Sequence, residues 1–405
     1  MTPAPQDQDI SSGMLLLLAT ASGLIVANLY YAQTLVGPIS AATGLSASLA
    51  GLIVTLTQIG YATGLLLIVP LGDLVENRVL VVRSLLFTSV ALLVAAFSTS
   101  GTVFLAASLA IGLGSVAAQV LVPYAAHLSP QATRGQAVGK VMSGLLLGIM
   151  LARPAASLIA GHSSWQVVFG AAAVLTAALA LALRRALPQR MPSSALSYSG
   201  LIGSLWALFA GTPVLRRRAA YQAGLFGAFS LFWTVTPMML AGPQFHLSQT
   251  GIAIFALVGM AGAVVSPIAG RLADAGHTLA ATAGALALAV VSFALPMLAP
   301  ASREVALGLL VAASILLDMA VAMNLVLGQR AIFSLGAAIR SRLNAIYIAL
   351  FFVGGATGSA LGAWVFASHG WQATLLTGMA FAAVPLAYWL SEFWQRQAAA
   401  GHGRN

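Results

Sequence analysis

Twelve apolar runs separated by short polar gaps make up most of this sequence. Each run is close to the roughly 20 residues that a helix needs to cross a bilayer. Hydrophobic residues make up 60% of the chain and charged residues only 6%, which would leave a soluble protein of this size without enough polar surface. The sequence therefore predicts an all-α membrane protein with twelve transmembrane helices. They are expected at residues 13–36, 49–71, 79–98, 102–125, 139–161, 165–186, 219–241, 249–270, 278–299, 304–328, 342–366 and 371–393.

Almost all basic residues lie on one side of this arrangement. Of the 18 Lys and Arg residues, 16 lie in or beside every second gap or in the C-terminal segment, whereas the opposite side has only Arg303. Lys and Arg in short loops are retained in the cytoplasm, so both termini and the long gap 187–218 are expected there. The first twelve residues lack the positive region of a cleaved signal, and the first helix is therefore expected to stay in the mature protein.

The two halves of the chain repeat one plan. At a constant offset of 206 residues, Arg134, Gly148 and Trp165 return as Arg340, Gly354 and Trp371. Parallel repeats of six helices are a construction that transporters use. We therefore expect a six-helix bundle over residues 1–186, a cytoplasmic linker over 187–218 and a second six-helix bundle over 219–405. Within the linker, residues 201–209 fit either a short helix on the membrane surface or a plain loop.

The loops after the second and eighth runs carry related segments, PLGDLVENR and GRLADAG. They resemble the G-x-L-x-D-R-x-G-R-[KR] motif of the major facilitator superfamily, and the resemblance extends over nearly all of the 405 residues. In that family the loop holds the two halves together on the cytoplasmic face. The resemblance therefore implies a gating role for Asp73 and Arg78 in the first copy and for Asp274 in the second.

Three further segments, NLYYAQTLVGPI, PLGD and LLLGIMLARP, look like those of bacterial sugar-efflux and drug-efflux permeases. This resemblance implies a secondary transporter of the bacterial inner membrane that exports a small organic molecule at the expense of the proton gradient. The sequence departs from the family's antiporter motif, G-x-x-x-G-P-x-x-G-G, where Arg153 precedes Pro154 and where Ser157 and Leu158 replace the closing glycines. A facilitator or importer of a small organic anion, without obligatory proton coupling, therefore stays open as an alternative.

Arg153 and Asp318 are the two ionisable residues that lie furthest from any predicted helix end. A charge at such depth costs at least about 2.5–3.5 kcal/mol on insertion scales, so something must offset that cost. In a transporter, Arg153 could bind an anionic substrate and Asp318 could carry the coupling proton. Alternatively, Arg153 bonds carbonyls freed by Pro154, and neighbouring hydroxyls or amides hold Asp318. A direct pair between the two is not favoured, because their predicted depths differ by roughly 9 Å.

Polar and aromatic side chains elsewhere in the runs supply candidates for a substrate cavity. In the resembling family the first, fourth, seventh and tenth helices line the central cavity, which here makes Asn28, Gln119 and Gln222 candidate contacts. Gln222 shares one helical stripe with Phe226 and Trp233, and an aromatic wall with a polar end suits an amphipathic organic molecule. Alternatively, the amides bond neighbouring helices, and the aromatic stripe packs against lipid or another helix.

Small residues recur at every fourth position in the fifth and eleventh runs. Such spacing lets two helix backbones approach closely, and we assign these residues to packing and not to ligand binding. They are Gly144, Gly148, Ala152 and Ala156 in the fifth run, and Gly354, Gly358 and Gly362 in the eleventh.

Several classes of protein are excluded by what the sequence lacks. It has no Cys, which removes disulfides, thiolate metal sites and thiol nucleophiles. GQAVGK at 135–140 has only three residues between its glycines and is no phosphate-binding loop, and neither H-E-x-x-H nor G-x-S-x-G occurs. The net charge of +10 is the orienting charge described above and forms no basic face with interleaved aromatic residues, which argues against nucleic acid. We expect a monomeric transporter and no enzyme, whose partners are a small-molecule substrate, protons and the lipid bilayer, with no cofactor and no metal.

Overall fold

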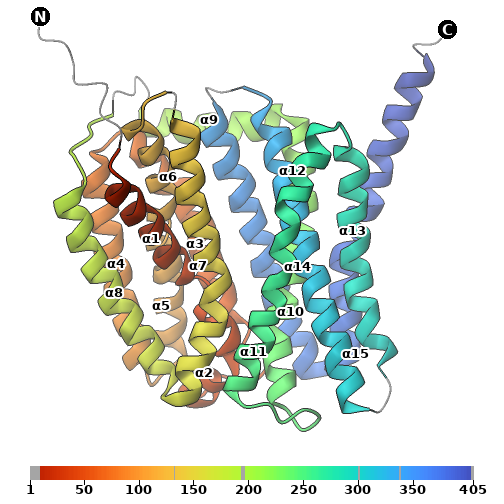
Figure 1. Ribbon diagram of the computed structural model, residues 1–405. Coiled ribbons are helices and arrows are strands. Elements are labelled where there is room, and N and C mark those ends of the chain that lie inside the picture. Colours follow the sequence, from red (N-terminus) through yellow and green to blue (C-terminus); the bar gives the residue numbers. More distant parts are fainter. Residues whose placement is uncertain (1–9, 132, 193–196, 300–301, 337–338, 403–405) are drawn as a thin grey trace, which may run out of the picture. The chain divides into compact units, whose positions relative to one another are not determined.

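The computed structural model of the protein describes residues 10–131, 133–192, 197–299, 302–336 and 339–402. Within the helices, the side chains of residues 263, 264, 266 and 395–402 also lie outside the described part. All regular structure in the described residues is helical (Figure 1). The predicted position of the N-terminus, and the basic side chains of Arg396 and Arg404, fall outside what is described.

The first half of the chain is a series of helices, some of which continue one another along the same path (Figure 1). They are α1 (Ser12–Ala27), the 3-10 helix η1 (Tyr31–Thr34), α2 (Val36–Thr43), α3 (Leu52–Leu67), η2 (Val69–Asp73), α4 (Asn77–Phe97), α5 (Gly101–Gly114), α6 (Ala117–Leu128), α7 (Arg134–His162), α8 (Trp165–Ala186) and α9 (Tyr198–Gly211).

The second half repeats this construction. It contains α10 (Pro213–Ala241), α11 (Gln249–Gly259), η3 (Met260–Val265), α12 (Ser266–Asp274), α13 (Thr278–Ala294), η4 (Leu295–Leu298), α14 (Arg303–Phe333) and α15 (Arg340–His402). The chain divides into two compact units, Met1–Gly44 with Leu56–Ser204, and Leu45–Thr55 with Leu205–Asn405. We call these the first and the second unit. The functional division into 1–186, a linker and 219–405 stays a prediction.

Each of the twelve predicted runs contains helix. Ten stretches of the described chain are long and apolar enough to cross a membrane. The last of them, Arg340–Trp394, holds two of the predicted runs, which meet at Gly370. Gly370 has φ 78° and ψ −170°, a backbone conformation that residues with a Cβ rarely adopt, so the helix direction changes there. The first run corresponds to the shorter helix α1 and the turns that follow it.

Five of the predicted runs are not one continuous α-helix, which the apolar pattern did not predict. The second and the ninth pass into the 3-10 helices η2 and η4 near their ends, and the other three are interrupted further inside. The first ends as a helix at Ala27 and continues through η1 and α2. The fourth breaks between α5 and α6, where the hydroxyl of Ser115 bonds the carbonyl of Ile111 at 2.7 Å, a local bond that competes with helix geometry. The eighth passes through η3 before α12, and Pro267 in the first turn of α12 cannot donate a backbone hydrogen bond.

The open alternative for residues 201–209 is resolved in favour of a helix. These residues lie inside α9, which runs from Tyr198 to Gly211. Its expected position on the membrane surface stays a prediction.

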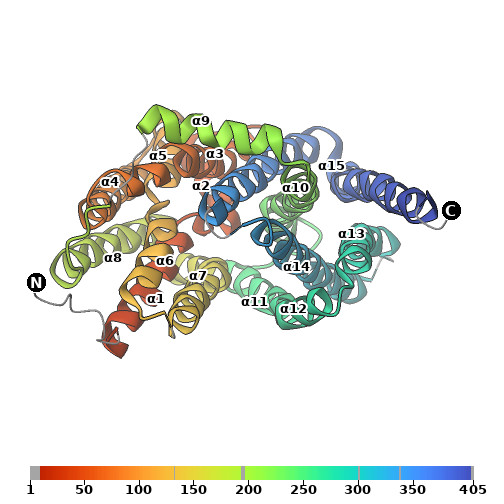
Figure 2. The same cartoon turned by 90° about the horizontal axis from the view of Figure 1, so that it is seen from above.

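The predicted close approach of the small-residue helices is confirmed in both units. In the first unit α1 packs against α7, and in the second α10 packs against α15 (Figure 2). A Cβ on Gly148 would lie 2.1 Å from the carbonyl oxygen of Gly23, and a Cβ on Gly358 would lie 2.0 Å from that of Gly227. Only glycine permits backbones so close, and the same helix pair is used in each half of the chain.

Candidate functional site

Asp318 lies at the centre of α14, 15 residues from Arg303 and 15 from Phe333. Its carboxylate oxygen Oδ1 accepts a 3.0 Å hydrogen bond from Nε1 of Trp233 on α10. Trp233 is fully buried, whereas Asp318 is half-buried. The structure thus brings together two candidates that the sequence analysis had treated separately. The indole donor fixes the orientation of the carboxylate.

The end of α11 and the 3-10 helix η3 pack directly on Asp318 and Trp233. A Cβ on Gly262 would lie 2.7 Å from Cβ of Asp318, and a Cβ on Gly259 would lie 2.9 Å from the indole of Trp233. The hydroxyl of Ser314, one turn before Asp318, also lies beside Gly259. Two glycines are therefore what allows η3 to reach Asp318 and Trp233. A larger side chain at either position would push the helices apart.

Gln222 lies on α10, 11 residues before Trp233, and is paired with an amide on α14. Nδ2 of Asn324 donates to Oε1 of Gln222 at 2.7 Å, and Nε2 of Gln222 donates to the carbonyl of Val321 at 3.4 Å. Both side chains are fully buried, and within the described residues Oδ1 of Asn324 has no hydrogen-bond partner. Gln222 therefore bonds a neighbouring helix, as its structural alternative predicted. A role in substrate binding stays a prediction.

The aromatic stripe of α10 packs inside the second unit. The ring of Phe226 stacks on Phe351 of α15 with centroids 3.7 Å apart, and on Phe229 with centroids 5.2 Å apart. Phe229 lies in turn 6.4 Å from the indole of Trp233. Phe226 is only 2% exposed, so its contacts are those of a packed core. The suggested role of Phe226 as a wall for substrate stays a prediction.

Arg153 lies nine residues before the end of α7 in the first unit and is 3% exposed. Its backbone carbonyl accepts a 3.3 Å hydrogen bond from the hydroxyl of Thr34, which ties α7 to η1. Next in sequence to Thr34 is Gln33, which is fully buried. Neither amide atom of Gln33, nor Nδ2 of the buried Asn28, has a hydrogen-bond partner among the described residues. Buried polar groups left unsatisfied cost about 1–3 kcal/mol each, so these amides destabilise the fold unless another group bonds them.

Gln119 is engaged by a tyrosine. Its Nε2 donates to the hydroxyl of Tyr61 on α3 at 3.1 Å, and Tyr61 is 1% exposed. Gln119 itself is half-buried. This bond ties α6 to α3 inside the first unit, and a contact between Gln119 and substrate stays a prediction.

The loop after η2 is organised by residues other than the predicted gating pair. Asp73 is exposed. Glu76 caps α4 by accepting from the N–H groups of Arg78 at 3.1 Å and Val79 at 3.0 Å. The buried Asn77 donates to the carbonyl of Gly72 at 2.6 Å and accepts from Nη1 of Arg190 at 2.9 Å.

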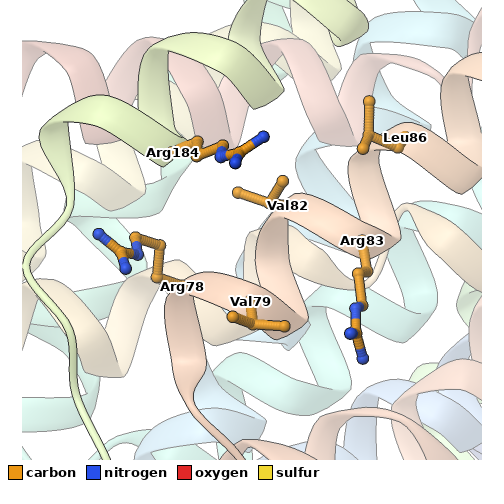
Figure 3. Close-up of a pocket in the computed structure, with 6 residues that line it drawn as sticks. All are labelled: Arg78, Val79, Val82, Arg83, Leu86 and Arg184. Carbon is orange, nitrogen blue, oxygen red and sulfur yellow. The ribbon is translucent and has the colours of Figure 1, made fainter.

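The gating candidate Arg78 is attached to the same loop. Its guanidinium lies 4.0 Å from Glu76 and donates to the carbonyl of Leu187 at 3.3 Å. It also lines a cavity between α4 and α8 (Figure 3). Glu76 and Asn77 were not among the predicted gating residues, because they stand where the family's motif has glycine and arginine. The acidic residue directly before an apolar run was the available signal for a helix cap.

Asp274, the gating candidate in the second unit, forms an ion pair with Arg330. Asp274 ends α12, and Arg330 lies in the last turn of α14. The side chains are 65% and 47% exposed, so the pair lies at the surface. Exposed ion pairs contribute at most about 1 kcal/mol to stability, so this pair can break and reform repeatedly.

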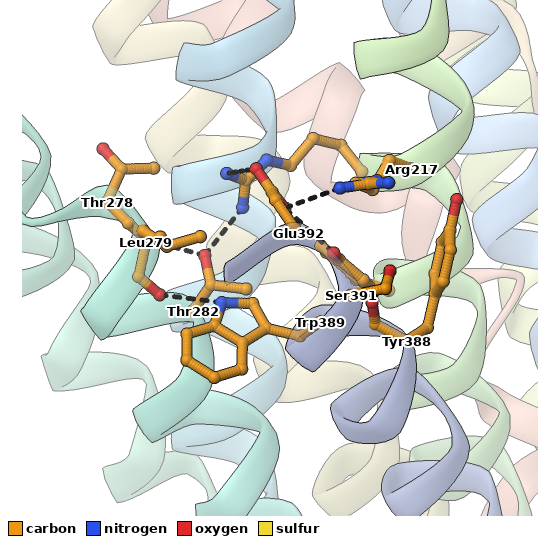
Figure 4. Close-up of polar contacts among 10 residues, drawn as sticks. Arg217, Thr278, Leu279, Thr282, Tyr388, Trp389, Ser391 and Glu392 are labelled. Carbon is orange, nitrogen blue, oxygen red and sulfur yellow. Dashed lines mark hydrogen bonds and ion pairs between the residues drawn. The ribbon is translucent and has the colours of Figure 1, made fainter. Parts of the chain in front are cut away.

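Glu392 on α15 forms a buried charged cluster that the sequence analysis did not anticipate (Figure 4). Oε1 of Glu392 lies 3.9 Å from Arg218, and Oε2 lies 4.0 Å from Arg217 and accepts a 2.9 Å hydrogen bond from Tyr221. Nη1 of Arg218 also donates to the hydroxyl of Thr282 on α13 at 2.7 Å. The cluster therefore ties α10, α13 and α15 together. Glu392 is the one acidic residue of its run, and it lies near the run end that is predicted to face the cytoplasm, where the arginines gather. This position was the feature of the sequence that could have indicated an ion pair.

No group of three or more His, Asp or Glu side chains in the described part of the chain is arranged to hold a metal ion. The buried and half-buried ionisable groups instead gather at Asp318 and at Glu392 in the second unit and around Arg153 in the first. Among the described residues, none of these groups contains the nucleophile, base and oxyanion donors that a hydrolytic enzyme requires.

Comparisons with known proteins agree with this arrangement. The family model of the Major Facilitator Superfamily matches residues 14–332. The chain is 39% identical over 393 residues to the uncharacterized transporter YgaY of Escherichia coli O157:H7, covering 97% of this chain and 99% of the relative. It is 33% identical over 357 residues to the probable transporter SCO4007 of Streptomyces coelicolor, covering 88% and 82% of the two chains.

A solved structure shares the fold. The crystal structure of the nucleoside transporter NupG superposes with a TM-score of 0.74 at 17% identity, covering 94% of this chain and 99% of that one. At this identity the likeness concerns the fold alone. The assignment rests on the family model, which matches residues 14–332, and on the bacterial relatives, which cover 97% and 88% of this chain. The chain belongs to the major facilitator superfamily and is a multi-pass membrane transporter of a small molecule, not an enzyme.

Proposed function

We propose that this protein is a proton-coupled secondary transporter that exports a small organic molecule across the inner membrane of a bacterium. The observation that carries the proposal is the hydrogen bond from Trp233 to Asp318. Asp318 is the one carboxylate remote from any predicted helix end. It lies at the centre of a 31-residue helix, about 22 Å from either end at 1.5 Å per residue. Transporters of this type hold substrate and coupling ions near the bilayer midplane.

The bond gives a physical route from proton binding to movement. A hydrogen bond to an ionised carboxylate is roughly twice as strong as one to a neutral group. When Asp318 takes up a proton, its bond to Trp233 weakens, and the contact between α10 and α14 loosens with it. When the proton leaves, the contact tightens. Binding of a proton thereby favours one arrangement of these two helices over the other, which is what coupling requires.

The packing around Asp318 supports this role. The segment η3 reaches the carboxylate only because Gly259 and Gly262 lack side chains. A short 3-10 segment inside a membrane helix is a common place for a hinge. We propose that α11 and α12 change their relative direction at η3 as Asp318 changes charge.

The test is flux in proteoliposomes with a substrate found by screening drugs, sugars and amino acids in cells with and without the protein. An imposed pH gradient should drive uphill movement of that substrate, with proton flux alongside it. The Asp318→Asn variant should lose uphill movement and keep substrate exchange, which needs no net proton transfer. Uphill transport by Asp318→Asn at the expense of a pH gradient shows that the coupling group lies elsewhere.

A second candidate function is a facilitator or importer of a small organic anion. The observation that favours it is the buried Arg153 close to η1, where the amide of Gln33 has no hydrogen-bond partner among the described residues. A carboxylate or phosphate ligand could accept from both groups. This reading requires no proton movement, so measuring charge transfer during transport separates it from the first.

A further inference from the structure

A cavity of about 430 Å³ opens between the first turns of α4 and the last turn of α8, in the first unit (Figure 3). The two helices lie side by side, and the hydroxyl of Ser89 on α4 donates to the carbonyl of Ala173 on α8 at 2.8 Å. The cavity is lined by Arg78, Val79, Val82, Arg83, Leu86 and Arg184. It therefore combines three arginines with an apolar floor.

The charges of this cavity are largely uncompensated. Arg78 interacts with Glu76 and the carbonyl of Leu187. Arg83 and Arg184 are both exposed, and within the described residues neither has a hydrogen bond or an ion pair. No carboxylate lines the cavity. The cavity thus has two free guanidinium groups, the side chains best suited to bind a phosphate through paired hydrogen bonds.

The apolar side of the cavity continues along the two helices. Leu86, Val90 and Leu181 are 45%, 60% and 50% exposed. Exposed apolar side chains on a transmembrane helix face lipid chains. The cavity therefore has a charged end at the helix termini and an apolar end that continues toward the middle of the membrane. Figure 3 shows Arg78 and Arg184 on one side of Val79 and Val82, and Arg83 on the other side with its guanidinium directed away from the valines.

We propose that this cavity binds one anionic phospholipid. The phosphodiester of the headgroup accepts hydrogen bonds from Arg83 and Arg184, and an acyl chain lies along Val82 and Leu86. Basic pockets between transmembrane helices bind anionic lipid headgroups, and each basic residue near the surface contributes on the order of 1 kcal/mol, or about fivefold in affinity. With the proposed orientation, the lipid comes from the cytoplasmic leaflet. Proton coupling plays no part in this inference.

The experiment is native mass spectrometry of the full-length protein in detergent, titrated with phosphatidylglycerol or with phosphatidylcholine of the same acyl chains. The wild-type protein should bind one phosphatidylglycerol in preference to phosphatidylcholine. The double variant Arg83→Gln/Arg184→Gln should lose roughly 30-fold in affinity for phosphatidylglycerol. Its matched control is Arg134→Gln/Arg185→Gln, which removes two exposed arginines outside the cavity and should bind as the wild type does.

A third variant separates a lipid from a soluble anion. Val82→Trp fills the apolar floor and keeps all three arginines, so it should weaken phosphatidylglycerol binding. Inorganic phosphate and glycerol 3-phosphate are titrated in parallel. If these soluble anions bind as tightly as phosphatidylglycerol and Val82→Trp leaves them unaffected, the ligand is a soluble anion and the lipid proposal fails. The lipid proposal also fails if Arg83→Gln/Arg184→Gln binds phosphatidylglycerol as tightly as Arg134→Gln/Arg185→Gln does. It fails likewise if the wild-type protein binds phosphatidylglycerol and phosphatidylcholine equally.

Discussion

Nε1 of Trp233 lies 3.0 Å from Oδ1 of Asp318, and this hydrogen bond joins the centre of α14 to α10. An indole donates one hydrogen and carries no charge, so this bond orients the carboxylate and adds no opposite charge to it. An arginine in place of Trp233 would form a permanent ion pair. An uncharged donor such as Trp233 is consistent with a carboxylate that changes its protonation state during the transport cycle.

The indole should report the protonation of Asp318 without any substrate. Because a proton on Asp318 weakens its bond to Trp233, we expect the fluorescence of Trp233 to change as the purified protein is acidified. Asp318→Asn should make that emission component independent of pH, and Trp233→Phe should remove it. Trp206→Phe is the control, since Trp206 is 70% exposed on α9 and distant in sequence from this pair. A pH response that persists unchanged in Asp318→Asn contradicts the assignment.

The loop after η2 allows a role in gating to be separated from a role in stability. Glu76 satisfies two backbone donors at the start of α4, so Glu76→Ala should lower the free energy of unfolding by about 0.5–2 kcal/mol. Asp73 is exposed, and Asp73→Asn should leave stability unchanged while it slows the transport cycle. Thermal unfolding in detergent, together with equilibrium substrate binding and the transport maximum, checks both. A large loss of substrate affinity in Asp73→Asn with an unchanged maximum rate argues against gating.

The twelve helices could be predicted from the sequence because the bilayer fixes the length of each apolar run. That α7 approaches a neighbour closely could also be predicted, because Gly144 and Gly148 lie one turn apart on one face, but its partner α1 could not. The breaks at Ser115 and at η3 could not. They depend on local side-chain bonds and on neighbours such as α14, which approach from distant parts of the chain.

The candidate site was predicted only residue by residue. Asp318 is conspicuous because a charge amid apolar residues is rare, but its partner Trp233 lies 85 residues away and on another helix. The cluster at Glu392 escaped notice for the same reason, since Tyr221 lies 171 residues away from it. Periodicity identifies the face of a helix and leaves open which helix that face meets.

The cluster at Glu392 gives a prediction about stability. Arg218 is 4% exposed, so Glu392→Ala leaves a buried guanidinium without its carboxylate, a change that costs about 3–5 kcal/mol. Asp274→Ala is the matched control, because it also removes one carboxylate from an ion pair but at an exposed position, where at most about 1 kcal/mol is lost. Denaturant unfolding in detergent measures both. Equal losses in the two variants would show that the Glu392 cluster contributes no more than a surface pair.

The orientation of the chain can be tested on an exposed position of α9. The bias of Lys and Arg predicts that α9 faces the cytoplasm and that the loop between α10 and α11 faces the outside. The protein has no native Cys, so single cysteines can be introduced without background. Ser199→Cys and Gln244→Cys both replace exposed polar residues. A thiol reagent that cannot cross the membrane should label Gln244→Cys in intact cells and label Ser199→Cys only after the cells are opened. The reverse labelling pattern would show that the topology is inverted, and it would place the proposed lipid in the outer leaflet.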